Sequence, residues 1–218
     1  MCGRFTQTAT TEQLIEEFML DESFEAEARY NIAPTQTVAA VRESEGKRKL
    51  ALLKWGLVPS WSKDPTIGVR MINARSETVA EKPSFRSAFM KRRCIVPSTG
   101  FYEWQKVDAK KEPYFIGMRG RNVFGIAGLW ESWEGPDGYL ETCTLLTTSA
   151  NELVKSIHER MPVILSHDDY GKWFDLKTTA DELHALFRPF STEMMEMYRV
   201  DKHVNSPKND DPSCIAPV

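Results

Sequence analysis

The sequence has few cysteines, and none of them forms a pair at the spacing of a metal site or a redox motif. Its four cysteines, Cys2, Cys94, Cys143 and Cys214, lie far apart, and the chain contains no C-x-x-C. In a reducing compartment this spacing argues against a disulfide framework and against a zinc site. We therefore expect no metal and no cofactor, and we interpret Cys94 and Cys143 as small buried residues within strands.

The sequence also lacks long apolar runs. No stretch approaches the ~20 apolar residues that a membrane-spanning helix needs, and the first residues do not form the apolar run of a signal peptide. The chain has 218 residues, of which 41% are hydrophobic and 27% charged, which favours one globular domain over 1–218. We expect a cytoplasmic protein with no membrane partner and take a monomer as the starting hypothesis.

Acidic residues are absent from Lys82 to Tyr102, although the whole chain has a net charge of -3. This segment carries five positive charges, from Lys82, Arg86, Lys91, Arg92 and Arg93. A local basic face can bind phosphates on a protein that is acidic overall. A solvated surface explains the same charges, so the segment alone does not identify a partner.

No internal repeat and no glycine-rich phosphate loop interrupts the pattern of expected elements. Capped helices are predicted from Thr10 and Thr179, each with a glutamine or glutamate three residues later, and a third from Ser149 to about Glu159. A short helix is predicted over 83–92. Strands are predicted over 37–41 and 49–55, and five more over 93–148, with turns at 108–112, 119–122 and 134–138.

This alternation predicts an α+β fold with a mostly antiparallel, barrel-like β core and flanking helices. The last residues, at about 206–218, have no periodicity, and we expect them to form an irregular tail that includes Cys214.

Cys2 has an unusual position, directly behind the first methionine. If Met1 is removed, one residue carries both a free α-amine and a thiol. These two nucleophiles together can do chemistry that neither does alone, because both can attack the same carbon atom.

Polar and aromatic residues cluster in several strand-rich stretches. Asn73 and Arg75 are two residues apart, and therefore on one face if the backbone is extended. Glu103 lies between Tyr102 and Trp104, where burial would raise the pKa of its carboxyl.

Two further stretches have the same character. His158 and Arg160 lie where a predicted helix meets Pro162, and Trp55 and Trp61 flank Pro59. Each of these residues has a structural explanation, such as a core tryptophan or a histidine at a helix C-terminus. Spacing alone does not show that they meet in space.

Seven separated motifs together resemble the SOS-response-associated peptidase (SRAP) family, whose members are abasic-site processing proteins. The motifs are MCGRF at the start, YNIAPT (30–35), WGLVPSW (55–61), INARSET (72–78), SFRSAF with RRCIVPSTGFYEW (84–104), AGLWE (127–131) and HERMPVIL (158–165). A late VNSPKNDDPSC (204–214) adds to them. Their order along most of the chain makes the resemblance specific.

The resemblance implies a covalent reaction at Cys2 with abasic sites in single-stranded DNA. The α-amine would condense with the ring-opened sugar aldehyde to a Schiff base, and the thiol would then close a thiazolidine ring. Such a protein acts in the DNA damage response as a lesion-processing enzyme with lyase-type chemistry. Removal of Met1, by self-cleavage or by an aminopeptidase, would have to come first.

The resemblance also implies roles for individual residues. Glu103 matches the catalytic glutamate, His158 the histidine that assists ring opening or reversal, and Asn73 the asparagine that orients Cys2. The residues implied to contact DNA are Arg4, Arg75, Arg86 and Arg160 on phosphates, with Trp104 and Trp61 stacking on bases.

Two other functions remain open from the residues alone. An N-terminal-nucleophile amidohydrolase can also begin Met-Cys-Gly, with the thiol attacking an amide; the glutaminases of that class rely on a downstream Asn-Gly pair, and this sequence contains no Asn-Gly. A non-catalytic module that binds single-stranded DNA would use the basic and aromatic residues and leave Glu103 and His158 without a task.

Overall fold

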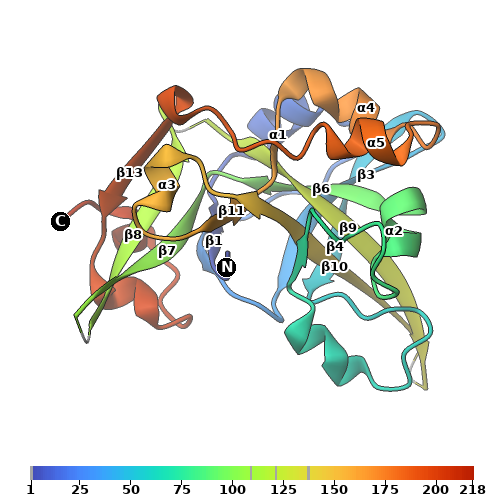
Figure 1. The fold of residues 1–218 in the computed structure, drawn as a ribbon, viewed down its shortest axis with the longest axis horizontal. Coiled ribbons are helices and arrows are strands. Elements are labelled where there is room, and N and C mark those ends of the chain that lie inside the picture. Colours follow the sequence, from blue (N-terminus) through green and yellow to red (C-terminus); the bar gives the residue numbers. More distant parts are fainter. Residues whose placement is uncertain (1, 109, 121, 137) are drawn as a thin grey trace.

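The computed structural model describes residues 2–108, 110–120, 122–136 and 138–218. It has two β-sheets with short helices around them (Figure 1). The predicted α+β class with a mostly antiparallel, barrel-like core is confirmed. Among the described residues, no helix is both long and apolar enough to cross a membrane.

Five strands close the larger sheet into a barrel. Going round the ring, β10 pairs with β4, β4 with β3, β3 with β6, β6 with β9, and β9 again with β10. Only the β10–β4 contact in this ring is parallel. The bounds are β3 Thr37–Ser44, β4 Lys47–Trp55, β6 Arg93–Ser98, β9 Phe124–Gly135 and β10 Gly138–Ser149.

Short strands extend this sheet at its open ends. Strand β5 (Asn73–Arg75) pairs in parallel with the C-terminal half of β10. Strand β11 (Arg160–Pro162) pairs antiparallel with the same half of β10. Strand β12 (Ile164–Leu165) pairs with β9. Residues that are far apart in sequence, from β5 and β11, are thereby held on either side of one strand.

The second sheet has five strands in the order β13-β8-β7-β1-β2, all antiparallel. Its strands are β1 Phe5–Gln7, β2 Arg29–Ile32, β7 Gly100–Val107, β8 Lys110–Met118 and β13 Met195–Arg199. In Figure 1 it forms the left side of the molecule. The N-terminal strand lies in its interior, so the first residues are held beside β7.

The helices begin largely where the sequence predicted. At the start of α1 (Thr11–Phe18) the Thr10 hydroxyl accepts a hydrogen bond from the Gln13 backbone N–H, and the Gln13 side chain accepts one from the Thr10 backbone N–H. Thr179 and Glu182 form the same reciprocal pair at the start of α5 (Ala180–His184). The predicted start at Ser149 is wrong. Ser149 ends β10, and Asn151 is the cap of a helix of one turn, α3 (Glu152–Lys155). The other helices are α2 (Arg86–Lys91) and α4 (Tyr170–Phe174).

Most predicted strands are present, but two hairpins are tighter than expected. β7 and β8 pair as far as Val107 and Lys110, inside the predicted turn at 108–112, and β9 and β10 pair as far as Gly135 and Gly138. The polar side chains of these segments misled the assignment, because antiparallel strands tolerate polar residues on a solvated face. Residues 109, 121 and 137 of the predicted turns lie outside the described residues.

The C-terminal segment packs back onto the second sheet. Asp210 accepts hydrogen bonds from the backbone N–H groups of Tyr30 (2.5 Å) and Asn31 (2.9 Å) and pairs with the Arg29 side chain on β2. A short 3-10 helix, Pro212–Ile215, buries the Cys214 side chain. Residues 206–218 are thus tied to β2 by specific polar contacts.

Candidate functional site

Cys2 lies three residues before the start of β1, and its side chain is completely buried. The thiol belongs to the apolar cluster between the two sheets, with Phe5, Ile32 and Trp55 among its members. The side-chain amide of Asn73 donates a hydrogen bond of 2.7 Å to the Cys2 carbonyl oxygen. Asn73 is the first residue of β5, and the parallel pairing with β10 fixes its position.

Glu103 enters the same region from β7. β1 is the neighbour of β7, with Phe5 opposite Phe101, and the Tyr102 N–H donates to the Arg4 carbonyl at 3.0 Å. Only 4% of Glu103 is exposed. Burial raises the pKa of its carboxyl, and nearby His158 opposes that shift without cancelling it. The sequence left the net direction open; the structure shows that burial prevails.

The charge of Glu103 also acts on Cys2. Burial is the main cause that raises the pKa of the Cys2 thiol, and the neighbouring Glu103 carboxylate raises it further. The thiol is therefore protonated at neutral pH. A nucleophilic attack by this sulfur would therefore need a base to accept its proton.

His158 completes the group from the turn that follows α3. Its Nδ1 lies 3.9 Å from Glu103 Oε1. The same nitrogen lies 3.0 Å from both the backbone nitrogen and the carbonyl oxygen of Arg160. Depending on the tautomer, it accepts from the Arg160 N–H or donates to the Arg160 carbonyl.

Two of the residues expected to contact DNA are held by the C-terminal segment. Arg4 Nη1 donates to Asn31 Oδ1 (2.6 Å) and to the Val204 carbonyl (2.9 Å), and its guanidinium carbon lies 5.7 Å from the centre of the Trp104 ring. The Trp104 indole N–H donates to Asn205 Oδ1 at 2.8 Å. The sequence did not single out Asn31 or Asn205, whose only signal was membership of two of the motifs.

Arg160 has partners of its own. Its guanidinium forms a two-pronged ion pair with Glu77, and its Nη2 also donates to the Thr147 carbonyl at 2.6 Å. Glu77 was not among the predicted site residues. The available signal was its place in INARSET, two residues after Arg75 and therefore next to the same strand.

Arg75, Arg86 and Trp61 differ from these in being exposed. Arg75 lies opposite Thr147 in the pairing of β5 with β10, and so belongs to the same neighbourhood as Arg160. Arg86 begins α2, which lies on the opposite side of the molecule from α3 and β7 in Figure 1. The fold therefore brings Arg75 toward the Cys2 region and leaves Arg86 apart from it.

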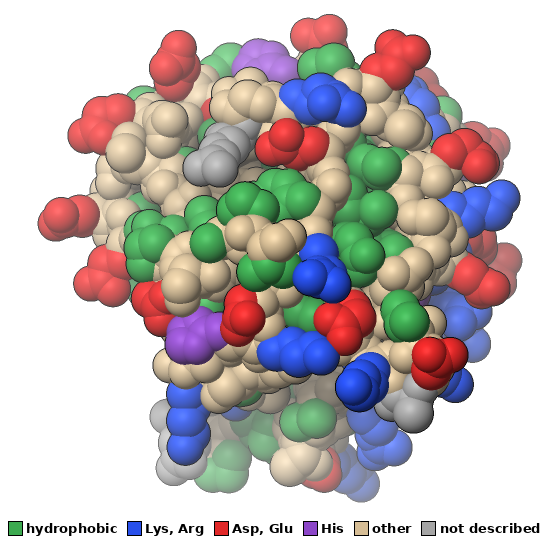
Figure 2. Space-filling model, turned by 90° about the vertical axis from the view of Figure 1, so that its left-hand side faces the viewer, with side chains coloured by type: hydrophobic (Ala, Val, Ile, Leu, Met, Phe, Trp, Pro, Cys, Tyr) green, Lys and Arg blue, Asp and Glu red, His purple; other side chains and the backbone are tan. Residues whose placement is uncertain are grey.

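The basic segment from Lys82 to Tyr102 is less basic on its surface than its sequence indicated. Arg93 is 4% exposed and donates to the backbone carbonyls of Phe89, Met90, Trp173 and Asp175. Arg92 pairs with Glu131. On the side of the molecule away from α2, shown in Figure 2, acidic and basic side chains are interspersed.

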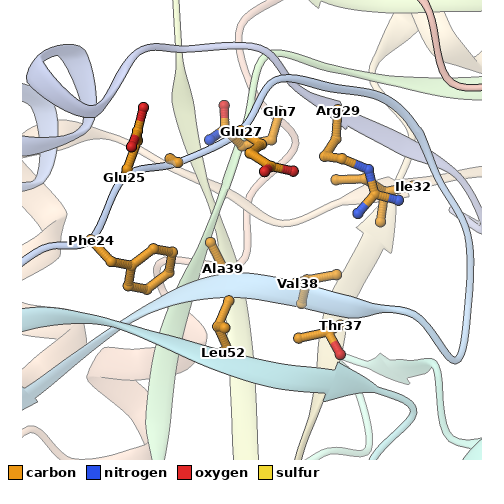
Figure 3. A pocket seen from close by; sticks show the side chains of 11 residues that line it. Gln7, Phe24, Glu25, Glu27, Arg29, Ile32, Thr37, Val38, Ala39 and Leu52 are labelled. Atoms are coloured by element: carbon orange, nitrogen blue, oxygen red, sulfur yellow. The ribbon is translucent and has the colours of Figure 1, made fainter.

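A hollow of about 300 Å³ lies elsewhere, between residues 24–29 and strands β3 and β4 (Figure 3). Phe24, Val38 and Leu52 form its apolar part, and Glu25 and Glu27 lie at its rim. None of Cys2, Asn73, Glu103 and His158 lines it. This hollow is therefore separate from Cys2, whose side chain is covered by packed side chains.

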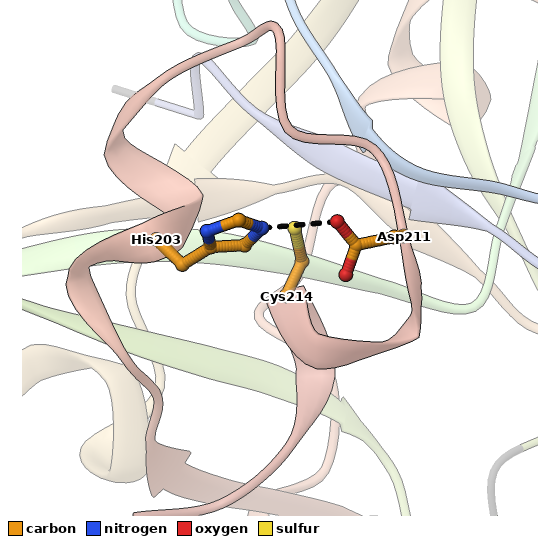
Figure 4. A group of neighbouring side chains, drawn as sticks. All are labelled: His203, Asp211 and Cys214. Carbon is orange, nitrogen blue, oxygen red and sulfur yellow. Dashed lines mark hydrogen bonds and ion pairs between the residues drawn. The ribbon is translucent and has the colours of Figure 1, made fainter.

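Three residues of the C-terminal segment carry atoms of the kind that bind metals. Ligand atoms of His203, Asp211 and Cys214 lie within 4.8 Å of one another (Figure 4). Each already has a protein partner: His203 Nε2 and Asp211 Oδ2 are 2.9 Å apart, and the Cys214 thiol donates to the Asn209 carbonyl at 3.4 Å. These hydrogen bonds account for the cluster, because they join different parts of the C-terminal segment to one another.

Known proteins are similar to this chain in sequence and in fold. The family model described as SOS response associated peptidase (SRAP) matches residues 1–207. The abasic site processing protein YoqW of Bacillus subtilis is 44% identical over 221 residues, which cover 99% of each chain. The abasic site processing protein YoaM of the same organism is 45% identical over 216 residues, covering 96% of this chain and 95% of YoaM.

A solved structure has the same fold. The crystal structure of a protein from Bacteroides thetaiotaomicron superimposes with a TM-score of 0.87 at 29% identity, covering 100% of both chains. The family match over most of the length, the two relatives and the shared fold all point to one assignment. The chain belongs to the SOS response associated peptidase (SRAP) family.

Proposed function

We propose that this protein handles abasic sites in single-stranded DNA by forming a covalent thiazolidine crosslink through Cys2 once Met1 has been removed. The observation that carries the proposal is the setting of Cys2, with its carbonyl held by Asn73 and its thiol within the electrostatic reach of Glu103. Relatives named abasic site processing proteins, matched over nearly the whole chain, support the choice of substrate.

The reaction divides into two steps that conserve atoms and charge. The free α-amine of Cys2 attacks the aldehyde carbon of the opened deoxyribose, and the resulting hydroxyl takes a proton from an acid and leaves as water, giving a protonated imine. The thiol then adds to the imine carbon, so that a C–S bond closes a five-membered ring and the thiol proton passes to a base. An N-terminal amine has a pKa of roughly 7.7 to 8.0, so on the order of a tenth of it is nucleophilic at pH 7.

Glu103 is suited to both proton transfers. A carboxyl whose pKa is raised by burial can donate a proton to the departing water and can afterwards accept the proton of the thiol. The raised pKa of the thiol makes this second transfer necessary, since the sulfur reaches the imine as S–H. Holding the aldehyde beside both nucleophiles adds the rate gain of proximity.

His158 is proposed to act on the sugar oxygen. Its ring adjoins Glu103 and keeps a hydrogen-bond partner in either tautomer through the backbone of Arg160. In that position it can donate a proton to assist opening of the deoxyribose and, in the reverse direction, release of the crosslink.

The DNA track is proposed to run past the β5–β10–β11 edge. Exposed Arg75 supplies a phosphate contact there, and Arg160 lies on the other flank of β10. Arg4 and Trp104, which are held in place by the C-terminal segment, would contact the backbone and stack on a base next to the lesion. The roles of Arg86 and Trp61 stay predictions from the resemblance.

A denaturing gel tests the proposal. Protein freed of Met1 is incubated with single-stranded DNA that carries one abasic site, and with the same DNA lacking the lesion. We expect a heat-stable band of protein bound to DNA only with the lesion, its loss in Cys2→Ala, and no stable band in Cys2→Ser. Reversible binding without a covalent band would instead favour a non-catalytic DNA-binding module. Glutamine hydrolysis would favour the amidohydrolase.

A further inference from the structure

The ion pair between Arg160 and Glu77 occupies a guanidinium that faces the proposed DNA track. Both outer nitrogens of Arg160 are engaged, Nη1 with Glu77 Oε1 and Nη2 with Glu77 Oε2 at 2.9 Å. The Arg160 side chain is 17% exposed and that of Glu77 is 52% exposed. The arginine is therefore fixed in the protein surface, while the carboxylate reaches it from the solvent side.

The β-sheet holds the arginine independently of Glu77. Arg160 Nη2 also donates to the Thr147 carbonyl (2.6 Å) and to Thr147 Oγ1 (3.2 Å). Thr147 lies on β10 between β5 and β11, opposite Arg75 on one side and Pro162 on the other. Removal of the glutamate charge would thus leave the guanidinium in place with its outer edge open.

A carboxylate and a phosphodiester present the same feature to arginine. Each offers two oxygens that accept parallel hydrogen bonds from the guanidinium fork. An ion pair with one partner half exposed is weak enough to be exchanged for another anion. The Glu77 carboxylate therefore occupies the position beside Arg160 that one phosphate of a bound strand could take.

We propose that Glu77 is a built-in competitor of DNA phosphate for Arg160, and that strand binding displaces it. The proposal rests on the proposed function for the identity of the ligand, a single-stranded DNA backbone. Displacement places a free carboxylate beside the strand and so lowers affinity for DNA without a lesion. Glu77 thereby favours stable occupancy only where Cys2 can trap the strand covalently.

Reversible binding to intact DNA isolates this effect from the chemistry. We would measure fluorescence anisotropy of a labelled single strand without abasic sites, over a series of salt concentrations, for the wild type and Glu77→Gln. The variant should bind about threefold to tenfold more tightly at low salt. Its plot of log affinity against log salt should keep the wild-type slope, because Arg160 contacts one phosphate in both proteins once the strand is bound.

The chain offers a matched control in Arg42 and Glu141. This pair is also two-pronged, with distances of 2.8 and 2.6 Å, and its side chains are 14% and 41% exposed. It lies on β3 and β10. Glu141→Gln removes an equivalent ion pair and charge, and DNA affinity should stay within about twofold of the wild type. Glu77→Asp keeps the carboxylate and should retain the wild-type affinity.

A double variant tests whether Glu77 acts through Arg160. In an Arg160→Gln background, Glu77→Gln should change affinity by less than about twofold, because the contested site is gone. Unchanged or weaker binding by Glu77→Gln alone would overturn the inference, as would an equal gain in the double variant. A crosslink that fails to form in the wild type while Glu77→Gln still binds more tightly would remove the proposed function and leave the competition standing.

Discussion

The side-chain amide of Asn73 and the carbonyl oxygen of Cys2 are joined by a hydrogen bond of 2.7 Å across 71 positions of sequence. This bond connects the N-terminal residue of the proposed chemistry to the barrel, since Asn73 begins β5 and β5 is paired to β10. Together with the pairing of β1 to β7, this bond holds the backbone of Cys2 in place.

Asn73→Ala should slow crosslink formation more than it destabilises the fold. Loss of one net hydrogen bond costs about 1 kcal/mol, whereas a misplaced nucleophile loses roughly tenfold to a hundredfold in rate. Single-turnover gels and thermal melts of the same preparations would measure both quantities. If the rate falls by no more than the measured loss of stability accounts for, Asn73 only supports the fold.

Glu103→Gln should change how stability depends on pH. Because the pKa of Glu103 is raised in the folded protein, the folded state holds its proton at pH values where the unfolded chain, with a pKa near 4.5, has lost it. Wild-type stability should therefore fall as pH rises from 4.5 through the raised pKa, and the variant should lack that fall. Melting temperatures measured from pH 4 to 8 should show that the variant becomes more stable relative to the wild type as the pH rises.

In the same experiment, Glu141→Gln should change the pH dependence of stability in the opposite direction. The Arg42 hydrogen bond lowers the pKa of Glu141, so this carboxylate stabilises the fold above its unfolded pKa and loses that contribution as pH falls. The variant should be less stable than the wild type near neutral pH. Parallel curves for Glu103→Gln and Glu141→Gln would contradict the assigned directions.

Glu103→Gln and His158→Ala should affect different directions of the reaction. The first should slow adduct formation while the final yield with excess protein approaches that of the wild type, because ring closure depends on Cys2. The second should mainly slow reversal. Formation and reversal rates between pH 5 and 9 would separate them, with a bell-shaped profile expected for formation. If neither substitution changes either rate, both residues are structural.

Arg75→Ala should weaken binding to intact single-stranded DNA and flatten its salt dependence. Arg75 is exposed on β5, and loss of one phosphate contact on a single strand changes the slope by roughly 0.7. Arg188→Ala, which removes an arginine that is 63% exposed and pairs with Asp169, is the control and should leave the slope as it is. A slope that is identical in all three proteins would take Arg75 out of the DNA track.

Local sequence signals determined part of the secondary structure, whereas strands β1, β2, β5 and β11 to β13 and helix α4 were not predicted. The capping pairs Thr10 with Gln13 and Thr179 with Glu182, and the strand patterns of β3, β4 and β6 to β10, act over a few residues, so they are readable without the fold. The start predicted at Ser149 failed because a second cap residue, Asn151, lies two positions further on, and the pairing of β10 with β11 kept Ser149 extended.

The partners of the charged side chains were decided by the tertiary structure. Arg4 meets Val204 and Arg160 meets Glu77 only because strand pairing brings residues together that are 200 and 83 positions apart. The net pKa shift of Glu103 was undecidable from its aromatic neighbours, since burial and a nearby histidine act in opposite directions. The sequence determined which residues can do the chemistry at Cys2; the fold decided which of them lie beside it and which are already bound elsewhere, because burial and ion pairing arise only between segments that the sheets bring into contact.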